Sequence, residues 1–130
     1  MKEINIGIKG SSSIKAEKNY LASSMGSGCL DVFATPAMIA LMENAASNCL
    51  SDYLEGDETT VGTSLEVKHI SATPAGMNVV AEAILTEVNG REFVFDVSAS
   101  DDAGIIGAGK HKRFLVYSSK FMEKTKSKLK

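Results

Sequence analysis

Residues 35–54 read TPAMIALMENAASNCLSDYL, and this stretch predicts one long helix that begins at Thr35 and Pro36. Proline favours a helix start, because the N–H that it lacks is not needed in the first turn. Apolar side chains recur at helical spacing along two adjacent lines, which are Met38, Leu41, Met42, Ala45, Cys49 and Tyr53, and Ile39, Ala46, Leu50 and Leu54. Two such lines form a wide apolar arc. We therefore expect a largely buried helix.

The chain on either side of this helix alternates between apolar and polar residues, as strands do. After the helix, the alternation covers residues 60–71, 77–88, 92–100 and 105–118. The Asn89-Gly90 pair is typical of a type I′ hairpin turn. Before the helix, residues 4–8 alternate, and the small residues 10–13 predict a turn followed by a returning strand.

The order of these elements predicts the fold. Strands joined by short turns pair antiparallel, and a sheet can bury one apolar face on a single helix. We therefore predict an α+β fold in which a curved antiparallel sheet wraps around one long central helix. The chain of 130 residues fits one domain over residues 1–130. Residues 22–29 lack charge and bulk and predict a loop that covers a site, and residues 122–130 predict a basic, flexible C-terminus.

Charge and cysteine content exclude several classes of protein. A formal net charge of -2 argues against nucleic-acid binding, although five lysines from Lys120 onward are accompanied only by Glu123. The two cysteines supply neither a disulfide framework nor a zinc-binding pattern, so we expect no metal. The first residues form no apolar signal segment, and no stretch resembles a membrane span. We expect a cytoplasmic protein with no membrane partner.

Glu43 is the only charged residue between Val32 and Ser51, and it aligns with apolar residues of the predicted helix. Removing a carboxylate from water costs several kcal/mol unless it is paired. Glu43 is therefore either a functional acid, for which general-base catalysis is the obvious role, or a glutamate at the edge of the face that reaches solvent.

His69 lies in the next predicted element. It continues the face formed by Val61, Thr63, Leu65 and Val67, which period two places toward the core. A single histidine on an apolar face is more often structural than catalytic. If the helix packs on this face, however, His69 and Glu43 lie on the two surfaces that meet.

Thr35 has two interpretations that the sequence leaves open. Threonine before Pro36 is a natural helix N-cap, and capping alone explains it. A helix N-terminus also presents free N–H groups toward developing negative charge, which suits an oxyanion or a substrate carboxyl group. About 12 Å of helix rise separates Thr35 from Glu43, but helical side chains lean toward the N-terminus, so the two could flank one small acyl group.

A short basic cluster, His111, Lys112 and Arg113, lies in the last predicted strand. A solvated face is the simpler interpretation, and contact with an anionic ligand is the alternative. The nearby Gly107-Ala108-Gly109 is not a dinucleotide fingerprint, because no helix pattern follows it.

Several short motifs occur in a characteristic order along the chain. They are Val32-Phe33-Ala34-Thr35, Glu43 eight positions later, Gly62-Thr63, His69 and Ser71-Ala72-Thr73-Pro74. In identity and spacing they resemble the hot-dog-fold thioesterases of the fluoroacetyl-CoA thioesterase-like family. The similarity continues through residues 97–99 and 106–109, His111, Arg113 and Lys120-Phe121, so that it covers roughly residues 32–121.

The resemblance implies a hot-dog fold that pairs as a homodimer, with an acyl-CoA as substrate and no separate cofactor. It implies Thr35, Glu43 and His69 as the catalytic set, in which His69 and Glu43 activate or deliver water and Thr35 positions the acyl group. Whether Glu43 or Thr35 becomes acylated stays open. The backbone of Gly62 would hold the thioester oxygen. Arg113, with Lys112 and the late lysines, is the expected contact for the CoA phosphates, because a guanidinium grips phosphate in a two-pronged way, and His111 is a further expected substrate-binding residue.

Residues 25–29 depart from the family. They read MGSGC and contain no aromatic ring, where the fluoroacetyl-CoA-selective enzyme has an aromatic lid. We therefore expect hydrolysis of a different short or medium acyl-CoA. The alternatives are a non-catalytic acyl-CoA-binding hot-dog protein and a hot-dog enoyl-CoA hydratase or dehydratase, which acts at the β-carbon.

Overall fold

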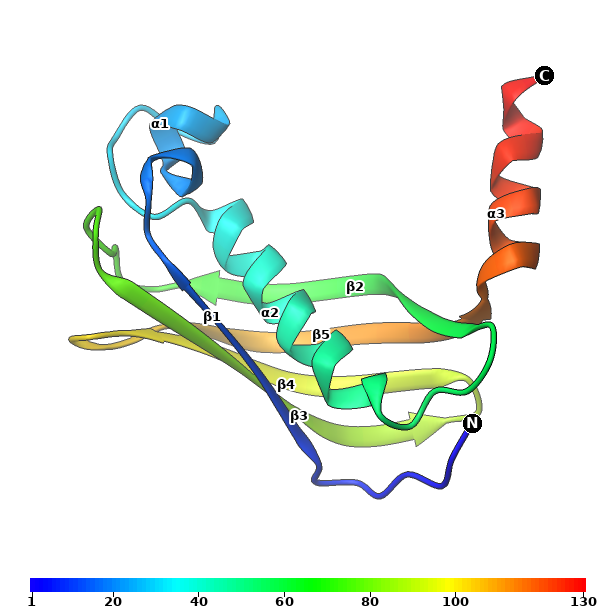
Figure 1. The fold of residues 1–130 in the computed structure, drawn as a ribbon. Coiled ribbons are helices and arrows are strands. Elements are labelled where there is room, and N and C mark those ends of the chain that lie inside the picture. The colour runs from blue at the N-terminus through cyan, green and yellow to red at the C-terminus, as the bar shows by residue number, and fades with distance from the viewer.

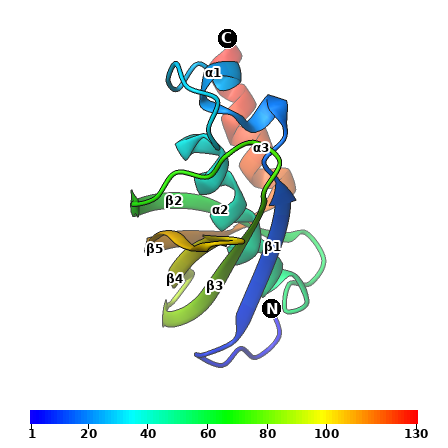
Figure 2. The ribbon, with the colours of Figure 1, turned by 90° about the vertical axis from the view of Figure 1, so that its left-hand side faces the viewer.

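The computed structural model describes residues 1–130 and confirms the predicted α+β architecture. One antiparallel sheet contains five strands in the order β1-β3-β4-β5-β2. The strands are β1 (Lys9–Lys15), β2 (Glu58–His69), β3 (Asn78–Asn89), β4 (Glu92–Asp101) and β5 (Gly104–Tyr117). Figure 2 shows the sheet curving around helix α2 (Thr35–Ser51), with β2 at one edge and β1 at the other.

Helix α2 supplies the centre of the core, as the two apolar lines predict. Its buried residues are Ala37, Met38, Leu41, Met42, Ala45, Ala46, Cys49 and Leu50. The alternate residues of β3 that face it, Val79, Ala81, Ala83 and Leu85, are also buried. Alanine on both surfaces allows the helix to lie close to the sheet. The helix ends at Ser51, slightly before the predicted end near Leu54.

The turn predicted at residues 10–13 is wrong, because these residues lie inside strand β1, which pairs with β3. Small side chains serve close packing here. A Cβ atom added to Gly10 would lie 2.3 Å from the Ala45 carbonyl oxygen and 2.5 Å from the Cys49 nitrogen. Glycine therefore lets the backbone of β1 touch the backbone of α2.

The hairpin between β3 and β4 forms where it is predicted, but its turn type differs. Asn89 pairs with Glu92 as the last ladder pair, so the loop consists of Gly90 and Arg91. Only Gly90 has a positive φ, 64°. A type I′ turn requires positive φ at both central residues, whereas a type II′ turn requires it only at the first.

A β-bulge in β2 changes which residues face the core. The register with β5 shifts between Gly62 and Ser64 and leaves Thr63 unpaired. As a result Thr60 is buried and Thr63 is exposed, so the predicted face shared by residues 61 and 63 with His69 is wrong. An inserted residue reverses the alternation on one side of a bulge.

Two peripheral segments are helical where the sequence predicts irregular chain. The segment predicted as a loop contains a helical turn, α1 (Ala22–Met25), which follows a short 3-10 turn, η1 (Lys18–Tyr20). The basic C-terminus forms α3 (Ser118–Lys126) and the 3-10 turn η2 (Ser127–Leu129). Figure 1 shows α3 projecting from the end of β5.

Two further features complete the description of the chain. The two cysteines differ in environment, because Cys29 is exposed beside α1 and Cys49 is buried on α2. None of the helices combines the length and the hydropathy needed to cross a membrane.

Candidate active site

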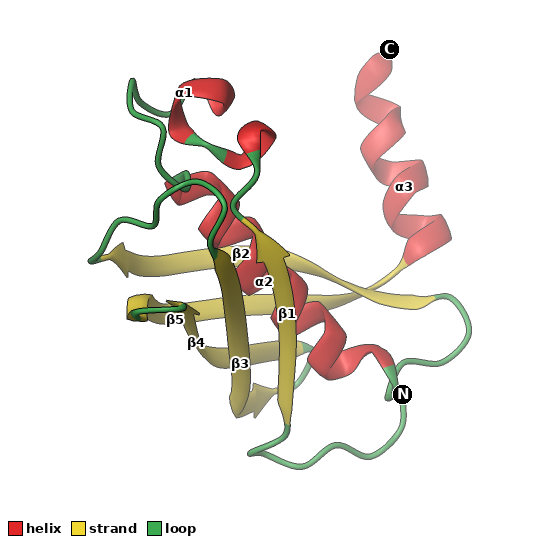
Figure 3. Cartoon of the chain, turned by 60° about the vertical axis from the view of Figure 1, so that its left-hand side comes forward, coloured by secondary structure: helices red, strands yellow, loops and turns green.

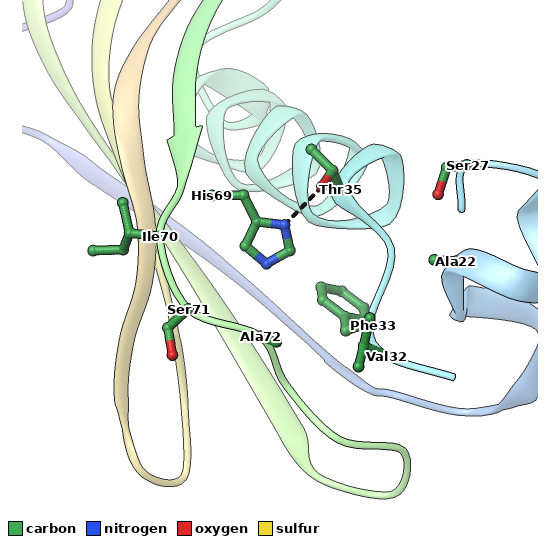
Figure 4. A pocket seen from close by; sticks show the side chains of 9 residues that line it. All are labelled: Ala22, Ser27, Val32, Phe33, Thr35, His69, Ile70, Ser71 and Ala72. Atoms are coloured by element: carbon green, nitrogen blue, oxygen red, sulfur yellow. Dashed lines mark hydrogen bonds between the residues drawn. The ribbon is translucent and has the colours of Figure 1, made fainter. Parts of the chain in front are cut away.

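The N-terminus of α2 and the end of β2 bring Thr35 and His69 together. Thr35 Oγ1 and His69 Nδ1 lie 2.8 Å apart, a hydrogen bond in which the tautomer of the imidazole decides which group donates (Figure 4). Ala34 is the N-cap of α2, and no side chain caps the helix. The capping interpretation of Thr35 is therefore wrong. Because Thr35 lies inside the first turn, its hydroxyl is free to bind the imidazole.

A cavity of about 250 Å³ adjoins this pair. Figure 4 shows the side chains that line it, which are Ala22, Ser27, Val32, Phe33, Thr35, His69, Ile70, Ser71 and Ala72. No charged carboxylate or ammonium group is among them. The segment predicted to cover a site does contribute to this lining, through Ala22 and Ser27. The lining is therefore uncharged and mixed: five apolar residues lie beside two serines and the Thr35–His69 pair.

His69 is poised to exchange a proton. Burial lowers its pKa below the ordinary value, and the backbone of Ser71 partly opposes this shift. Its Nε2 atom is buried without a hydrogen-bond partner in the chain. A neutral imidazole with one nitrogen bound and the other free can orient itself on Thr35 and act on a bound molecule with Nε2.

Glu43 lies in a second group of residues, in the middle of α2. The side chain of Glu43 is 39% exposed, and its Oε2 lies 3.8 Å from the Arg113 guanidinium. Gly62 lies beside it, since an added Cβ there would be 2.6 Å from the same oxygen. Glu43 is thus a half-buried carboxylate next to one cation. It is neither fully buried, as a desolvated functional acid would be, nor fully solvated, as a glutamate at the edge of the apolar face would be.

His111 and Arg113 are buried below Glu43, so the expectation of a solvated basic face is wrong. Alternation along β5 directs both side chains toward α2. The Arg113 Nε donates to Thr60 Oγ1 at 2.9 Å and its Nη2 donates to the Thr60 carbonyl at 3.0 Å. A guanidinium that is buried and bound in this way is not available to grip phosphate from solvent, which argues against that expected role.

Hydrogen bonds fix the state of His111. Its Nδ1 lies 2.9 Å from the Ser64 carbonyl, to which it must donate, and its Nε2 lies 3.2 Å from Arg113 Nη1, from which it must accept. Both bonds require the neutral tautomer with the proton on Nδ1. Burial, and then the charge of Arg113, lower the pKa of His111, while the bond to Ser64 and the charge of Glu43 oppose them.

The six residues named from the sequence thus form two groups rather than one. Thr35 and His69 form the first, and Glu43, Gly62, His111 and Arg113 form the second. Glu43 does not line the cavity beside Thr35 and His69, so one chain does not bring Thr35 and Glu43 to the same cavity. Sequence reasoning missed Thr60, which anchors Arg113. Its position two residues before Gly62, on the same strand face, is the signal that could have identified it.

Comparisons with a family model and with a known protein point to the same family. The model of a family described as "Fluoroacetyl-CoA-specific thioesterase" matches residues 16–119. The fluoroacetyl-CoA thioesterase of Streptantibioticus cattleyicolor is 41% identical over 98 residues, which are 75% of this chain and 70% of that protein.

Solved structures agree with this result. The fluoroacetyl-CoA thioesterase FlK is 31% identical, with a TM-score of 0.92 and 98% of each chain covered. A thioesterase superfamily member from Thermus thermophilus is 22% identical, with a TM-score of 0.90 and coverage of 98% of this chain and 94% of that one, and it shows the same fold. The chain therefore belongs to the fluoroacetyl-CoA-specific thioesterase family with the hot-dog fold.

Proposed function

We propose that the protein is an acyl-CoA thioesterase that hydrolyses a short or medium acyl-CoA to the free acid and CoA. The observation that carries this proposal is the Thr35–His69 pair on the wall of an uncharged cavity of about 250 Å³, which five apolar side chains help to line. Such a cavity suits an acyl chain whose carbonyl lies at the polar end. The family supports the same reaction, since its relative from Streptantibioticus cattleyicolor is named a fluoroacetyl-CoA thioesterase.

We assign the proton transfer to His69. Its neutral imidazole accepts a proton from water at Nε2, while Nδ1–H donates to Thr35 Oγ1. The water oxygen bonds to the carbonyl carbon, the C–S bond breaks, and the departing thiolate takes the proton to leave as CoA thiol. In a second route the Thr35 hydroxyl donates its proton to Nδ1 and its oxygen bonds to the carbonyl carbon. The C–S bond breaks, and the thiolate takes that proton to leave as CoA thiol. Water then hydrolyses the acyl-threonine to the free acid and restores the hydroxyl.

Glu43 and Gly62 join this reaction, in our proposal, through a second copy of the chain. β2 is an edge strand of 12 residues. An unpaired edge of this length favours antiparallel pairing with another β2. If the pairing is centred between Leu65 and Glu66, His69 of one subunit lies opposite Gly62 of the partner subunit. Glu43 of the partner subunit, beside that glycine, then faces the Thr35–His69 pair.

We propose that the enzyme does not require a fluorine atom on the acyl group. Residues 25–29 contain no aromatic ring, and only Ser27 of this segment lines the cavity. A fluoroacetyl-selective site would need a further element that recognises the fluorine atom. A short or medium unsubstituted acyl chain suits a cavity of about 250 Å³, where it would lie against the five apolar residues of the lining.

Thiol release from a panel of acyl-CoAs of increasing chain length tests the activity. We expect free CoA from the short and medium members, and about a 100-fold loss of kcat in His69→Ala and in Glu43→Gln. Enoyl-CoA hydration without thiol release would identify a hydratase. Tight acyl-CoA binding without turnover would identify a binding protein.

Mixed dimers test the shared site. A heterodimer of one Glu43→Gln subunit and one His69→Ala subunit contains one complete site if the groups meet across the interface, so about half of the wild-type activity should return. If both groups act within one chain, the heterodimer stays as inactive as its parents. Light scattering of each sample verifies that dimers are present.

A further inference from the structure

Helix α3 is rich in lysine, and its lysines form no ion pair within the chain. None of its residues is buried, and η2 continues it with Lys128, which Lys130 follows. The ion pairs of the chain involve Met1, Lys110 and Arg113, so no lysine of α3 or η2 takes part in one. The helix is nevertheless held firmly at its start, where Ser118 N–H donates to the Asp57 carbonyl at 2.8 Å and Ser119 N–H donates to its carboxylate at 3.0 Å.

The proposed substrate needs cations that the cavity does not supply. CoA carries several phosphate charges, and charge-assisted hydrogen bonds from lysine or arginine are their usual partners. The residues that line the cavity include no lysine or arginine. Arg113 is buried and bound to Thr60. The phosphates must therefore be bound outside the cavity.

The proposed dimer places α3 beside the other subunit's cavity. Figures 1 and 3 show α1 and α3 extending past the β2 edge, at opposite ends of that strand. Antiparallel pairing of two β2 strands creates a two-fold axis perpendicular to the sheet. Rotation about this axis keeps the α2 side of the sheet and exchanges the two ends of β2. The partner's α3 then lies next to α1, at the entrance to the Thr35–His69 cavity.

Helical periodicity selects the side of α3 that faces this entrance. Lys120 and Lys124 line a hollow with Val116, which alternates with the buried Leu115 and so lies on the sheet face away from α2. Ser119, bound to Asp57, lies outside this hollow, about 100° around the helix from Lys120 and about 140° from Lys124. A spacing of seven residues is close to two full turns, so Lys126 lies on the side of Ser119, with Met122 one turn before it.

We propose that Lys126 of α3 binds the phosphates of the CoA nucleotide held at the partner subunit's cavity, and that Lys124 does not. The inference rests on the proposed function and dimer. It assigns to the C-terminal helix a role in substrate affinity, exercised on the other subunit's site. The CoA nucleotide fits this surface by charge, since α3 and η2 form the basic part of a chain of net charge -2.

Charge reversal tests the assignment with a control on the same helix. Lys126→Glu should raise KM for the best acyl-CoA about tenfold with kcat unchanged, because a phosphate contact is lost and a repulsion is added. KM for the same acyl group on pantetheine, which lacks the nucleotide, should not change. Lys124→Glu carries the same charge change and should leave both values unchanged. Equal effects of the two variants would overturn the inference.

Mixed dimers test whether the lysine acts across the interface. One subunit carries His69→Ala and the other carries Lys126→Glu. The only intact catalytic pair then belongs to the Lys126→Glu subunit, and its entrance is flanked by a wild-type α3. A wild-type KM in this heterodimer supports the inference, and a raised KM overturns it.

A direct binding measurement separates this inference from the proposed function. Calorimetry with adenosine 3′,5′-bisphosphate should detect binding to the wild-type dimer that Lys126→Glu abolishes and Lys124→Glu retains. If the wild-type protein releases no thiol from any acyl-CoA, the proposed function fails, and this titration still decides the nucleotide site. If thiol is released but the titration shows no dependence on Lys126, only the inference fails.

Discussion

Gly62 is the residue at which the backbone of β2 makes room for the Glu43 side chain. The absence of a Cβ leaves space for the Glu43 carboxylate, and the pairing of β2 with β5 shifts register immediately after this glycine. The glycine does not have the positive φ that only glycine adopts readily. Glycine is therefore needed at position 62 because a larger residue would collide with the carboxylate, and not because of its backbone conformation.

Gly62→Ala should reduce activity much more than stability. The added Cβ would lie 2.6 Å from Glu43 Oε2, at the far end of a flexible side chain that can move aside. We expect kcat to fall about tenfold or more because the carboxylate is displaced, with an unchanged unfolding midpoint. Steady-state kinetics and thermal unfolding measure the two effects. A variant with full activity would show that the position of Glu43 is unimportant.

Arg113 supports Glu43 from below, and its replacement should not act as loss of a phosphate contact. Arg113→Lys keeps the charge but loses the paired bonds to Thr60. We expect kcat to fall by about tenfold on acyl-CoA and acyl-pantetheine alike, and the free energy of unfolding to fall by about 2 kcal/mol. Lys112→Ala is the neighbouring control and should change neither. A raised KM for acyl-CoA alone would restore the phosphate role.

At the scale of elements, the contact between β1 and α2 sets how closely the sheet surrounds its helix. Gly10 and the alanines of α2 and β3 bring two backbones into direct contact. The next serine, Ser11, accepts a hydrogen bond from Asn48 Nδ2 at its carbonyl, 3.0 Å away. This interface has almost no side chain that could adjust.

Gly10→Ala should therefore destabilise the protein. Its Cβ would lie 2.3 Å from the Ala45 carbonyl oxygen, so strand and helix must separate. Overpacking of this kind costs about 1–3 kcal/mol. Chemical denaturation measures the loss, with Gly28→Ala as the control, since its Cβ would meet only Ala22 at an ordinary 3.5 Å. Equal stability of the two variants would contradict the close contact.

The same contact explains where the sequence predicts the elements and where it does not. Helix α2 and the strands that follow it are predicted because their period is long and regular. Residues 10–13 are not, because small residues are equally typical of a turn and of a tight interface, and only the facing helix decides. The bulge at Thr63 has no local signal, and it reverses the predicted face of Val61.

At the scale of the whole molecule, the sequence selects candidate site residues but does not predict how they are grouped. Thr35, Glu43 and His69 stand out through residue type and spacing, and the family adds Gly62. Their division into two groups depends on α2 and β2 running in opposite directions. Burial of Arg113 depends on the pairing of β5 with β2, which the sequence of one strand does not contain.

Stability should fall in mildly acidic solution. Burial lowers the pKa of both His69 and His111 in the folded state. Each therefore takes up a proton on unfolding once the pH is below about 6.5, the ordinary histidine pKa. Their contribution is complete above that pH and is lost as the pH decreases through it. Urea unfolding between pH 5 and 7.5 should show this slope, and His111→Gln should flatten it. A constant free energy over this range would contradict the argument.

The different environments of the two cysteines allow a thiol-reactive label to be attached to the native chain at one of them alone. Burial raises the pKa of Cys49 to about 11, which leaves its thiol unreactive at neutral pH, whereas Cys29 is exposed. A maleimide dye should therefore attach at one position without any mutation. That position adjoins the segment whose Ala22 and Ser27 line the cavity. Fluorescence from the attached dye would then report, in the unmodified sequence, whether this segment moves when an acyl-CoA arrives.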